Sequence, residues 1–528
     1  MAVSTDQRFP GLRPAGATRA ARYRERGLWD DRRLGDGIEA AAASYPDRAA
    51  LIDDRETLTW GRLASAVRDA AGWLLGLGAG PGRAVVVVSG NVVDGAVCHH
   101  ALLRIGALAV LLDRRCGPAD LAFAVAATEA HLVLLPAGVS PALAAEAGAV
   151  PVAALDGWRS AGPSPWTPTE PDRDAPALVL FTSGTTSRPK GVAHSINTIT
   201  AGARNMAETT GTGLHSVIYL VSPLTSITGV MQMHLAADWH ATLVLDDDFE
   251  AERSLDRAAR LGATTLGGAP VIIERLIAVA DRRGQPDVAL RTLALGGTAL
   301  PRAFLQRIAG RYGIDIVRVY GSSEYPNATG RRAADAGPAP DPLADDGALM
   351  AGTEVRIGSS RHPQEGLLRG PALMLGYLDG ADSDDSFEDG WYRTGDLLEL
   401  AGDRLTVVGR LKEIVNRNGL KISLAEIDAA LSGLDGAVEA AGFGVADPAT
   451  GEHLAVAVYP RPDGQVTLAD MITHLRDQGL ATRKLPEEMV IWDGPLPRTA
   501  SGKVIRAALT LDAPAKPSSV VGRLEKLS

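Results

Sequence analysis

Apolar runs alternate with amphipathic segments along much of this chain. The first expected strands are residues 84–88, 107–112 and 131–135, and the expected helices around them are residues 62–77, 94–105 and 118–128. The strands are apolar at every position, which is typical of parallel sheets covered by helices rather than of sheets with one solvated face. The pattern therefore predicts an α/β fold with mostly parallel sheets.

The alternation continues beyond residue 170 and then changes character. Further expected elements are strands at 176–182, 217–221, 241–245, 291–295 and 314–320 and a helix at 301–312. Residues 331–385 are turn-rich, which favours antiparallel strands. A final α+β segment follows, with expected helices at 424–431 and 468–478 and strands at 438–445 and 454–459.

The length of 528 residues is too great for one hydrophobic core. We expect a large N-terminal domain at 1–408, a hinge at 409–412 and a small mobile C-terminal domain at 413–528. The Arg-rich residues 13–33 are expected to form a solvated arm, and the residues after 511 a loose tail.

The composition excludes several classes of protein. A net charge of −10 gives no basic footprint for nucleic-acid binding. Cys98 and Cys116 have no metal-ligand spacing, and two cysteines favour a reducing compartment over a disulfide scaffold. No apolar run is long enough to span a membrane, and the N-terminus lacks the apolar core of a signal peptide. A cytoplasmic enzyme without a membrane partner is expected.

A loop rich in small donors follows the expected strand at 176–182. Residues 182–191 read Thr-Ser-Gly-Thr-Thr-Ser-Arg-Pro-Lys-Gly. Backbone N–H groups, hydroxyls and a lysine at the end of a strand can bind a polyphosphate, although the spacing is not that of a P-loop. Two later expected strands also end in small residues, at 296–298 and 321–324, and ligands collect beyond the carboxyl ends of parallel strands. A shared nucleotide pocket is predicted.

Several short motifs then occur in a fixed order. They are Tyr-Gly-Ser-Ser-Glu at 320–324, Gly-Leu-Leu-Arg-Gly at 366–370, Tyr-Arg-Thr-Gly-Asp at 392–396, Gly-Arg-Leu-Lys at 409–412 and Pro-Arg-Thr-Ala-Ser-Gly-Lys at 497–503. With residues 182–191 they resemble the adenylate-forming superfamily of acyl-CoA synthetases, peptide-synthetase adenylation domains and luciferases. The resemblance covers residues 58–506 and is greatest to cyclohexanecarboxylate-type and medium-chain acyl-CoA ligases.

The resemblance implies a reaction and its co-substrates. ATP activates a carboxylic acid as an acyl-AMP with loss of pyrophosphate, and the thiol of coenzyme A then attacks. Implied catalytic residues are Lys503, beside the reacting carboxylate and α-phosphate, Glu324, which binds Mg²⁺, and Thr186 in the phosphate loop. The implied ATP- and AMP-binding residues are Thr182, Ser183, Gly184, Thr185, Thr186, Lys190, Gly297, Thr298, Ala299, Tyr320, Gly321, Ser322, Ser323, Asp396, Arg410 and Lys503.

The resemblance also implies a hinge and a channel for the thiol. Lys412 matches the position about which similar enzymes rotate the C-terminal domain between the two half-reactions. Asn418 and Gly419 match the lining of the pantetheine channel, where the family more often has two glycines. Asn418 is thus a departure from the family pattern.

The residues of the implied acyl pocket indicate the size and polarity of the acid. Its expected residues are Ser226, Gly229, Gly268, Gly297 and Tyr325. Many relatives have a histidine or aromatic residue where this chain has Ser226, and none of the residues matches the aspartate that holds an amino-acid ammonium. A bulky, mostly apolar acid (alicyclic, polycyclic or aryl) is therefore expected.

Other functions stay open on the sequence alone. A stand-alone adenylating enzyme would load the acid onto a carrier-protein phosphopantetheine, and residues 23–29 also resemble aryl-acid activators of that kind. A luciferase-like oxidative enzyme and a nucleotide-binding protein without catalysis are further alternatives. Retention of Glu324, Asp396, Arg410 and Lys503 argues against the last of these.

Overall fold

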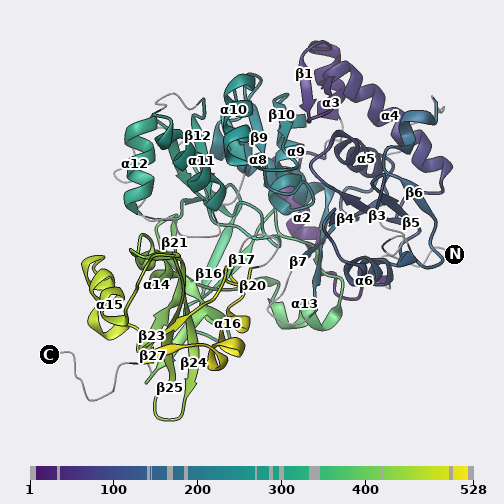
Figure 1. Ribbon diagram of the computed structural model, residues 1–528. Helices are drawn as coiled ribbons and strands as arrows, with labels where there is room; N and C mark the ends of the chain where they lie inside the picture. Colours follow the sequence, from purple (N-terminus) through teal and green to yellow (C-terminus); the bar gives the residue numbers. More distant parts are fainter. Residues whose placement is uncertain are drawn as a thin grey trace.

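The computed structural model of the chain describes residues 8–31, 36–139, 143, 145–162, 171–182, 188–267, 270–284, 289–296, 302–331, 345–418, 420–498 and 504–520. Helices and strands alternate through the first part of the chain, and the smaller C-terminal part forms a lobe of its own at the lower left of Figure 1. Among the described residues, no helix is long and apolar enough to cross a membrane.

The first sheet has the order β18-β8-β7-β4-β3-β5-β6. Its strands are β3 (Ala84–Ser89), β4 (Leu108–Asp113), β5 (Leu132–Leu135), β6 (Val152–Ala154), β7 (Pro176–Thr182), β8 (Lys190–Ser195) and β18 (Gly376–Tyr377). The strands from β7 to β6 are parallel, whereas β8 and β18 are antiparallel. The prediction of continuous buried strands is confirmed, since every residue of β3 is buried.

The second sheet has the order β13-β12-β11-β9-β10-β1-β2. Its strands are β1 (Ala49–Ile52), β2 (Thr57–Thr59), β9 (Val217–Leu220), β10 (Thr242–Leu245), β11 (Thr265–Gly267), β12 (Thr292–Leu295) and β13 (Asp315–Arg318). Only β2 is antiparallel among these described strands. The sequence pattern missed β1, β2 and β11, each of them four residues or shorter.

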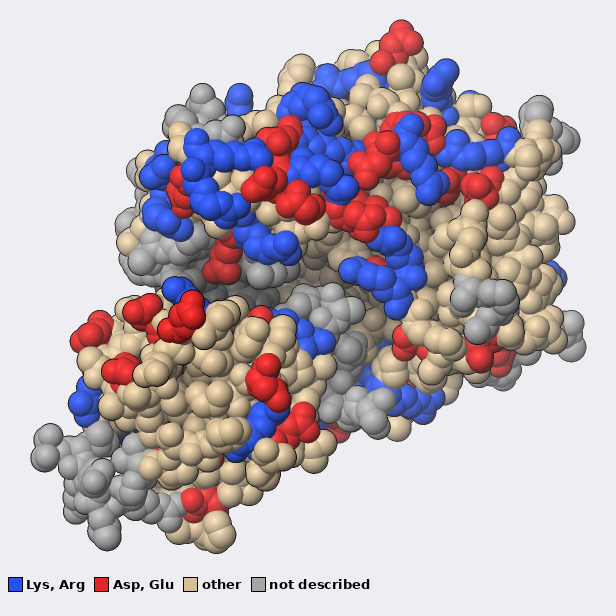
Figure 2. Space-filling view, in the orientation of Figure 1, with Lys and Arg blue, Asp and Glu red and all other residues tan. Residues whose placement is uncertain are grey.

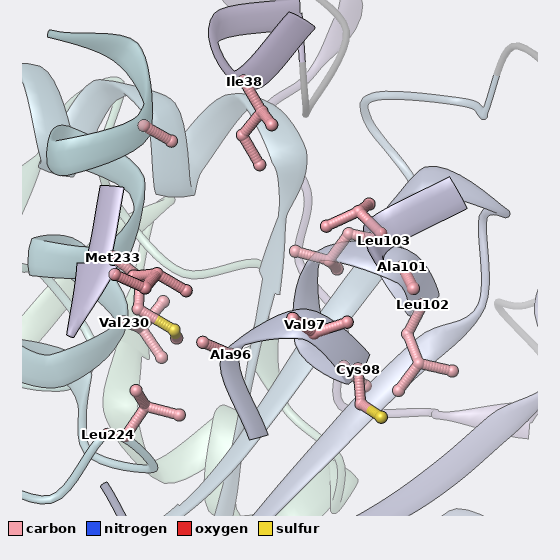
Figure 3. Close-up of a cluster of buried hydrophobic side chains, with 14 of the residues drawn as sticks. Ile38, Ala96, Val97, Cys98, Ala101, Leu102, Leu103, Leu224, Val230 and Met233 are labelled. Carbon is pink, nitrogen blue, oxygen red and sulfur yellow. The ribbon is translucent and has the colours of Figure 1, made fainter. Parts of the chain in front are cut away.

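Helices pack on both faces of the two sheets, and some of them lie between the sheets. The helices of the first half are α4 (Trp60–Gly76), α5 (Val93–Arg104) and α6 (Pro118–Thr128), and those of the second half are α8 (Ile196–Thr210), α9 (Ile227–Asp238), α10 (Ala251–Leu261), α11 (Pro270–Arg282) and α12 (Arg302–Tyr312). One hydrophobic cluster joins Val87 of β3, Leu243 of β10 and side chains of α4, α5 and α9. Figure 3 shows Ala96 and Val97 of α5 on the side that faces Val230 and Met233 of α9.

Three buried histidines lie within this apolar layer. The Nε2 atoms of His99 and His234 are 2.9 Å apart, and the ring of His100 lies 5.6 Å from that of His99 and 5.2 Å from that of His234. Burial lowers the pKa of His100 to about 4 and holds the pKa values of His99 and His234 well below the ordinary value. All three are therefore neutral near pH 7.

The third sheet is antiparallel, as the turn-rich sequence predicted. Its order is β14-β15-β21-β20-β17-β16, with β19 paired to β20. The strands are β14 (Thr329–Gly330), β15 (Ala348–Leu349), β16 (Glu354–Ile357), β17 (Glu365–Arg369), β19 (Phe387–Glu388), β20 (Trp391–Ala401) and β21 (Arg404–Arg410), and helix α13 (Gly380–Ser386) precedes β19.

The C-terminal segment has a fourth sheet, β23-β22-β25-β26-β27, with β24 paired to β25. Its elements are β22 (Ile414–Arg417), β23 (Leu420–Ser423), α14 (Leu424–Leu431), β24 (Ala437–Asp447), β25 (Gly451–Pro460), α15 (Leu468–Asp477), β26 (Glu488–Ile491), α16 (Arg506–Asp512) and β27 (Ser518–Val520). Two hydrophobic clusters are formed by residues of this segment alone. The domain limits at 408 and 413 remain a prediction.

Two expectations about the ends of the chain are wrong. The Arg-rich stretch contains helix α2 (Ala17–Glu25), and Tyr23 and Trp29 are buried with their rings 5.1 Å apart. Trp29 Nε1 donates to the carbonyl of Pro371 at 3.0 Å, so this stretch packs on the body. At the other end β27 pairs with β26, and residues 513–520 are not a loose tail. Neither feature could be predicted from the sequence, because isolated aromatic residues among many charges give no periodic pattern. Pairing between distant segments gives none either.

Candidate active site

A cleft of about 3120 Å³ lies between the N-terminal body and the C-terminal segment. Figure 2 shows this hollow between the larger part and the smaller lobe, with Arg, Lys, Asp and Glu side chains gathered on the larger part above it. The cleft is lined by residues at or just beyond the carboxyl ends of β7, β11, β12 and β13, namely Thr182, Gly267, Gly296 and Val319. Parallel strands bind ligands at this edge.

Tyr320, Asp396 and Arg410 meet on the wall of this cleft. The Tyr320 hydroxyl donates to Asp396 Oδ2 at 2.6 Å, and Arg410 Nε lies 2.9 Å from Asp396 Oδ1. Asp396 and Arg410 face each other in the register of β20 and β21, which fixes their separation. Burial, and then the charge of Asp396, raises the pKa of Tyr320 well above its ordinary value. Asp396 thus presents a buried carboxylate beside a fixed cation and a neutral phenol.

A buried ion pair supports the part of β20 that carries Asp396. Arg393 Nη2 lies 2.9 Å from Glu365 Oε2, and their side chains are 7% and 3% exposed. The other oxygen of Glu365 accepts a hydrogen bond from the backbone N–H of Gly395 at 3.2 Å. Gly395 has a φ of +70°, a conformation that side chains rarely adopt. Glu365 of β17 therefore holds the part of β20 that carries Asp396.

Glu324 lies farther along the cleft and is also anchored. Its Oε1 accepts a hydrogen bond from the Tyr377 hydroxyl at 2.8 Å. Burial, and then Glu324, raises the pKa of Tyr377. His194 Nε2 lies 2.7 Å from the carbonyl of Ser323, and burial lowers the His194 pKa to about 4. A neutral His194 that donates to Ser323 thus positions the residue before Glu324.

Lys190 and Tyr377 lie on neighbouring strands and line the cleft. Lys190 Nζ is 2.8 Å from Asp382 Oδ1 of α13 and 4.9 Å from the centre of the Tyr377 ring. Lys190 faces Thr182 in the register of β7 and β8, which closes the loop between them at its base. The Lys190 side chain is 20% exposed, and Asp382 occupies one of the three N–H donors of its ammonium group.

A family model described as AMP-binding enzyme matches residues 38–378, and a model of the AMP-binding enzyme C-terminal domain matches residues 426–503. The chain belongs to the AMP-binding enzyme family. The predicted resemblance to adenylate-forming enzymes is confirmed, and so is the class of acid–thiol ligase.

Relatives of this AMP-binding enzyme match over nearly its whole length. It is 30% identical to the sulfoacetate–CoA ligase of Cupriavidus necator, over 89% of this chain and 96% of the relative. It is 28% identical to the medium-chain fatty-acid–CoA ligase of Escherichia coli, over 94% and 93%. Its fold is similar to that of o-succinylbenzoate-CoA synthetase from Bacillus subtilis, solved with an acyl-adenylate (TM-score 0.78, 22% identity, 90% of this chain and 97% of that chain). The α/β fold class is confirmed.

Two residues that were assigned to the acyl pocket are packed inside this AMP-binding enzyme and do not form the cleft wall. Tyr325 is 0% exposed, and its hydroxyl lies 2.9 Å from Thr353 Oγ1, so its ring belongs to the core and not to the cleft wall. A Cβ on Gly229 would lie 2.3 Å from the carbonyl oxygen of Pro223. Gly229 therefore permits close packing inside the chain and does not enlarge the pocket. Both assignments are corrected.

Ser226 does line the cleft but has a structural role as well. It is the N-cap of α9, and its Oγ accepts from the backbone N–H of Gly229 at 3.2 Å and donates to the Pro223 carbonyl at 2.7 Å. The small polar residue at this position is thus explained by helix capping as well as by pocket volume.

Only some of the remaining assigned residues lie in the described part of the chain. Gly321, Ser322 and Ser323 line the cleft, as does Lys412, which lies in a short 3-10 helix at Leu411–Glu413. Asn418 has a φ of +52°, which asparagine tolerates better than most side chains and which explains how it replaces a glycine here. The other assigned residues lie outside the described residues: Ser183, Gly184, Thr185, Thr186, Gly268, Gly297, Thr298, Ala299, Gly419 and Lys503.

The sequence did not point to several residues that organise this site. Tyr377, Asp382 and His194 each contact an assigned residue, and Glu365 contacts Arg393 and Gly395 beside Asp396. Glu365 directly precedes the Gly-Leu-Leu-Arg-Gly motif, and this position was the only feature of the sequence that could have indicated its role. Tyr377 and Asp382 lie in a stretch without any motif.

Proposed function

We propose that this protein is an ATP-dependent carboxylate–CoA ligase that activates a bulky, mostly apolar acid. The acid would become an acyl-AMP with release of pyrophosphate, and CoA would then form the thioester after rotation of the C-terminal domain. The observation that carries the proposal is the meeting of Tyr320, Asp396 and Arg410 in the cleft of an AMP-binding enzyme. The domain rotation rests on the resemblance of Lys412 to a hinge residue.

Asp396 is proposed to bind the ribose of ATP. A buried carboxylate with two oxygens can accept a hydrogen bond from each ribose hydroxyl while Arg410 offsets its charge. The pKa of Arg410 is raised, chiefly by Asp396, so the cation persists throughout the working pH range. Tyr320 would then lie at the junction of ribose and base, where it fixes the carboxylate in one orientation.

Glu324 is proposed to hold Mg²⁺ together with phosphate oxygens. Among the described residues, no group of three carboxylates, histidines or cysteines could bind a metal alone. Magnesium at polyphosphates commonly uses one or two carboxylates and completes its shell with phosphate and water, so a single anchored glutamate fits. When bound, the ion would offset the negative charge of the phosphates, and Lys190 would hold the leaving pyrophosphate.

The reacting centre is assigned to Lys503 by resemblance. Charge must be offset where the carboxylate oxygen approaches the α-phosphorus and bond formation begins. A lysine ammonium can contact both groups at once. Lys503 and Thr186 keep their assigned catalytic roles as part of this proposal.

The cleft extends inward between α8, α9 and the second sheet, and this part is proposed to hold the acid. Its apolar lining supports a bulky acid: Met206, Ile218, Met231, Leu235, Ala294 and Val319. Two relatives are named for acids as different as sulfoacetate and medium-chain fatty acids, so sequence similarity alone does not identify the acid that this enzyme activates.

A screen of carboxylic acids for pyrophosphate release, with and without CoA, tests the proposal. We expect release with alicyclic, polycyclic or aryl acids and an acyl-CoA product when CoA is present. Acyl-AMP that accumulates and is not converted by CoA would instead indicate a carrier-protein pantetheine as the acceptor. The absence of release with any acid would contradict the proposal.

A further inference from the structure

The side chain of Asn91 links the first sheet to backbone groups of the second sheet. Asn91 lies two residues beyond β3 and is 4% exposed. Its Nδ2 donates to the carbonyls of Ser222 and Asp246, at 3.0 and 2.9 Å. Its Oδ1 accepts from the backbone N–H of Leu224 at 2.6 Å. An asparagine amide has two N–H donors and one carbonyl, so every polar group of this side chain is paired with backbone that follows β9 or β10.

The backbone around Asn91 contacts the second sheet as well. The N–H of Asn91 donates to Asp247 Oδ1 at 2.7 Å, and the other oxygen of Asp247 lies 3.2 Å from Arg114 Nε, beyond β4 of the first sheet. A Cβ on Gly90 would lie 2.1 Å from Asp247 Oδ1, so the glycine permits this close approach. The ends of β3 and β10 are therefore joined by side chains from both directions.

The segment that Asn91 holds forms part of the cleft wall. Residues 221–226 connect β9 to α9, and Ser222, Pro223 and Thr225 of this segment line the cleft. The N–H groups at 221 and 222 donate to the carbonyl of Gly267 at 2.9 and 3.1 Å, which fixes the start of the segment on β11. Its end is the N-cap of α9. Asn91 bonds the chain on both sides of Pro223, which has no N–H of its own, and so fixes the middle of the segment.

We propose that Asn91 is a positioning residue that fixes the 221–226 wall of the acid pocket relative to the first sheet. This inference rests on the proposed function and identifies a determinant of acid selection within it. Lys190, proposed to hold the pyrophosphate, lies on β8 of the first sheet, whereas the 221–226 wall belongs to the second. The acid must meet the α-phosphate in an exact geometry, and a displacement of about 1 Å can cost a hundredfold in rate. A fixed link between the two sheets supplies that geometry.

The variant Asn91→Leu tests the inference in the full-length enzyme. It keeps the approximate volume of the side chain and removes its hydrogen bonds, so the wall should lose its fixed position. The probes are cyclohexanecarboxylic, benzoic and naphthoic acids, together with the most active acid of the screen, assayed by pyrophosphate release. We expect kcat/KM for the preferred acid to fall roughly 10- to 100-fold. The ratio of kcat/KM between the preferred acid and the poorest acid used should fall roughly tenfold, while the KM for ATP changes little.

The ratio between acids separates positioning from stability. A smaller amount of folded enzyme lowers the rate with every acid by the same factor and leaves the ratio unchanged. Asn91→Ser is a milder variant, because the space that it opens can hold a water molecule bonded to the same backbone groups. Its ratio should lie between those of Asn91→Leu and the unmodified enzyme. If Asn91→Leu gives no melting transition, Asn91→Ser decides the question alone.

Asn197→Leu is the matched control. Asn197 is 3% exposed, its Nδ2 donates to Asp174 Oδ1 at 2.7 Å, and it is not among the described residues that line the cleft. The control therefore loses a buried amide of the same kind at another place. We expect it to keep the ratio between acids, whatever its effect on thermal melting.

The outcomes separate this inference from the function on which it rests. A ratio between acids that is the same in the Asn91 variants and the unmodified enzyme overturns the inference, because Asn91 then contributes to stability alone. A rise in the KM for ATP as large as the change in the acid ratio also overturns it, since the disturbance would not be confined to the acid wall. The absence of pyrophosphate release by the unmodified enzyme with every acid contradicts the ligase function, and the inference falls with it.

Discussion

The hydroxyl of Tyr320 donates to Asp396 Oδ2 over 2.6 Å, although 76 residues separate the two positions in the chain. Tyr320 follows a parallel strand of the second sheet, whereas Asp396 lies in the antiparallel third sheet. The proposed nucleotide site therefore lies where two sheets of different architecture meet, and the contact between Tyr320 and Asp396 depends on both sheets.

The first prediction concerns Asp396→Asn, which removes the charge that Arg410 and Tyr320 surround. Charge-assisted hydrogen bonds to ribose would be lost, and kcat/KM for ATP should fall roughly 10- to 100-fold. Pyrophosphate release at varied ATP concentration measures the effect. Glu399→Gln, at an exposed position on the same strand, is the matched control and should change little. An equal effect of both variants would contradict a ribose contact at Asp396.

The second prediction uses the ion pair between Lys190 and Asp382. Because Asp382 competes with phosphate for the charge of Lys190, Asp382→Asn should lower the KM for ATP by roughly two- to fivefold. Asp384→Asn removes a carboxylate on the same helix that pairs with Arg13 instead, and serves as the control. A higher KM in Asp382→Asn would mean that Asp382 itself assists nucleotide binding.

The third prediction separates the two half-reactions. Lys503→Ala should slow acyl-AMP formation by about 10²–10³-fold, the usual cost of losing a donor at the developing charge. The same variant should still convert supplied acyl-AMP and CoA into the thioester. In this step the thiol attacks the acyl carbon, AMP leaves, and no bond to the α-phosphorus is formed. Single-turnover assays of each step measure the two rates. An equal decrease in both rates would contradict the role assigned to Lys503.

The fourth prediction is a pH dependence of stability from the buried histidines. The pKa of His100 is about 4 in the folded chain and 6.5 ordinarily, so below pH 6.5 the unfolded state binds more protons. The contribution of His100 to the free energy of unfolding should thus fall as the pH drops from 6.5 to 4, by up to about 3 kcal/mol, and be constant above 6.5.

Urea unfolding at pH 7.5 and pH 5 checks this dependence. His100→Gln cannot titrate and should lose less stability on acidification than the unmodified chain, whatever its stability at pH 7.5. His131→Gln changes an exposed histidine and should behave as the unmodified chain does. An identical acid sensitivity of His100→Gln and the unmodified chain would contradict the prediction.

The sequence predicted those parts of the fold that depend on local patterns. Residues 118–128 and 424–431 form helices with the expected bounds, because their apolar periodicity and flanking residues are local signals. The motif positions Asp396 and Arg410 were predicted to share a site, and the register of two adjacent strands places them side by side.

The parts that could not be predicted depend on contacts between distant segments. Tyr377 holds Glu324 from 53 residues away, and no motif surrounds it. Gly229 was expected to leave space in the pocket, yet the space is occupied by the chain's own backbone at Pro223. A glycine has the same appearance in a sequence whether it faces a ligand or a carbonyl, and only the packing distinguishes the two.

The stoichiometry of products tests the central claim most directly. The enzyme is incubated with ATP, CoA and an acid that supports pyrophosphate release, and AMP, pyrophosphate and acyl-CoA are measured together. The account predicts that the three products form in equal amounts and that Asp396→Asn lowers all of them in parallel. Formation of ADP and phosphate, or of AMP without any thioester from CoA, would contradict it.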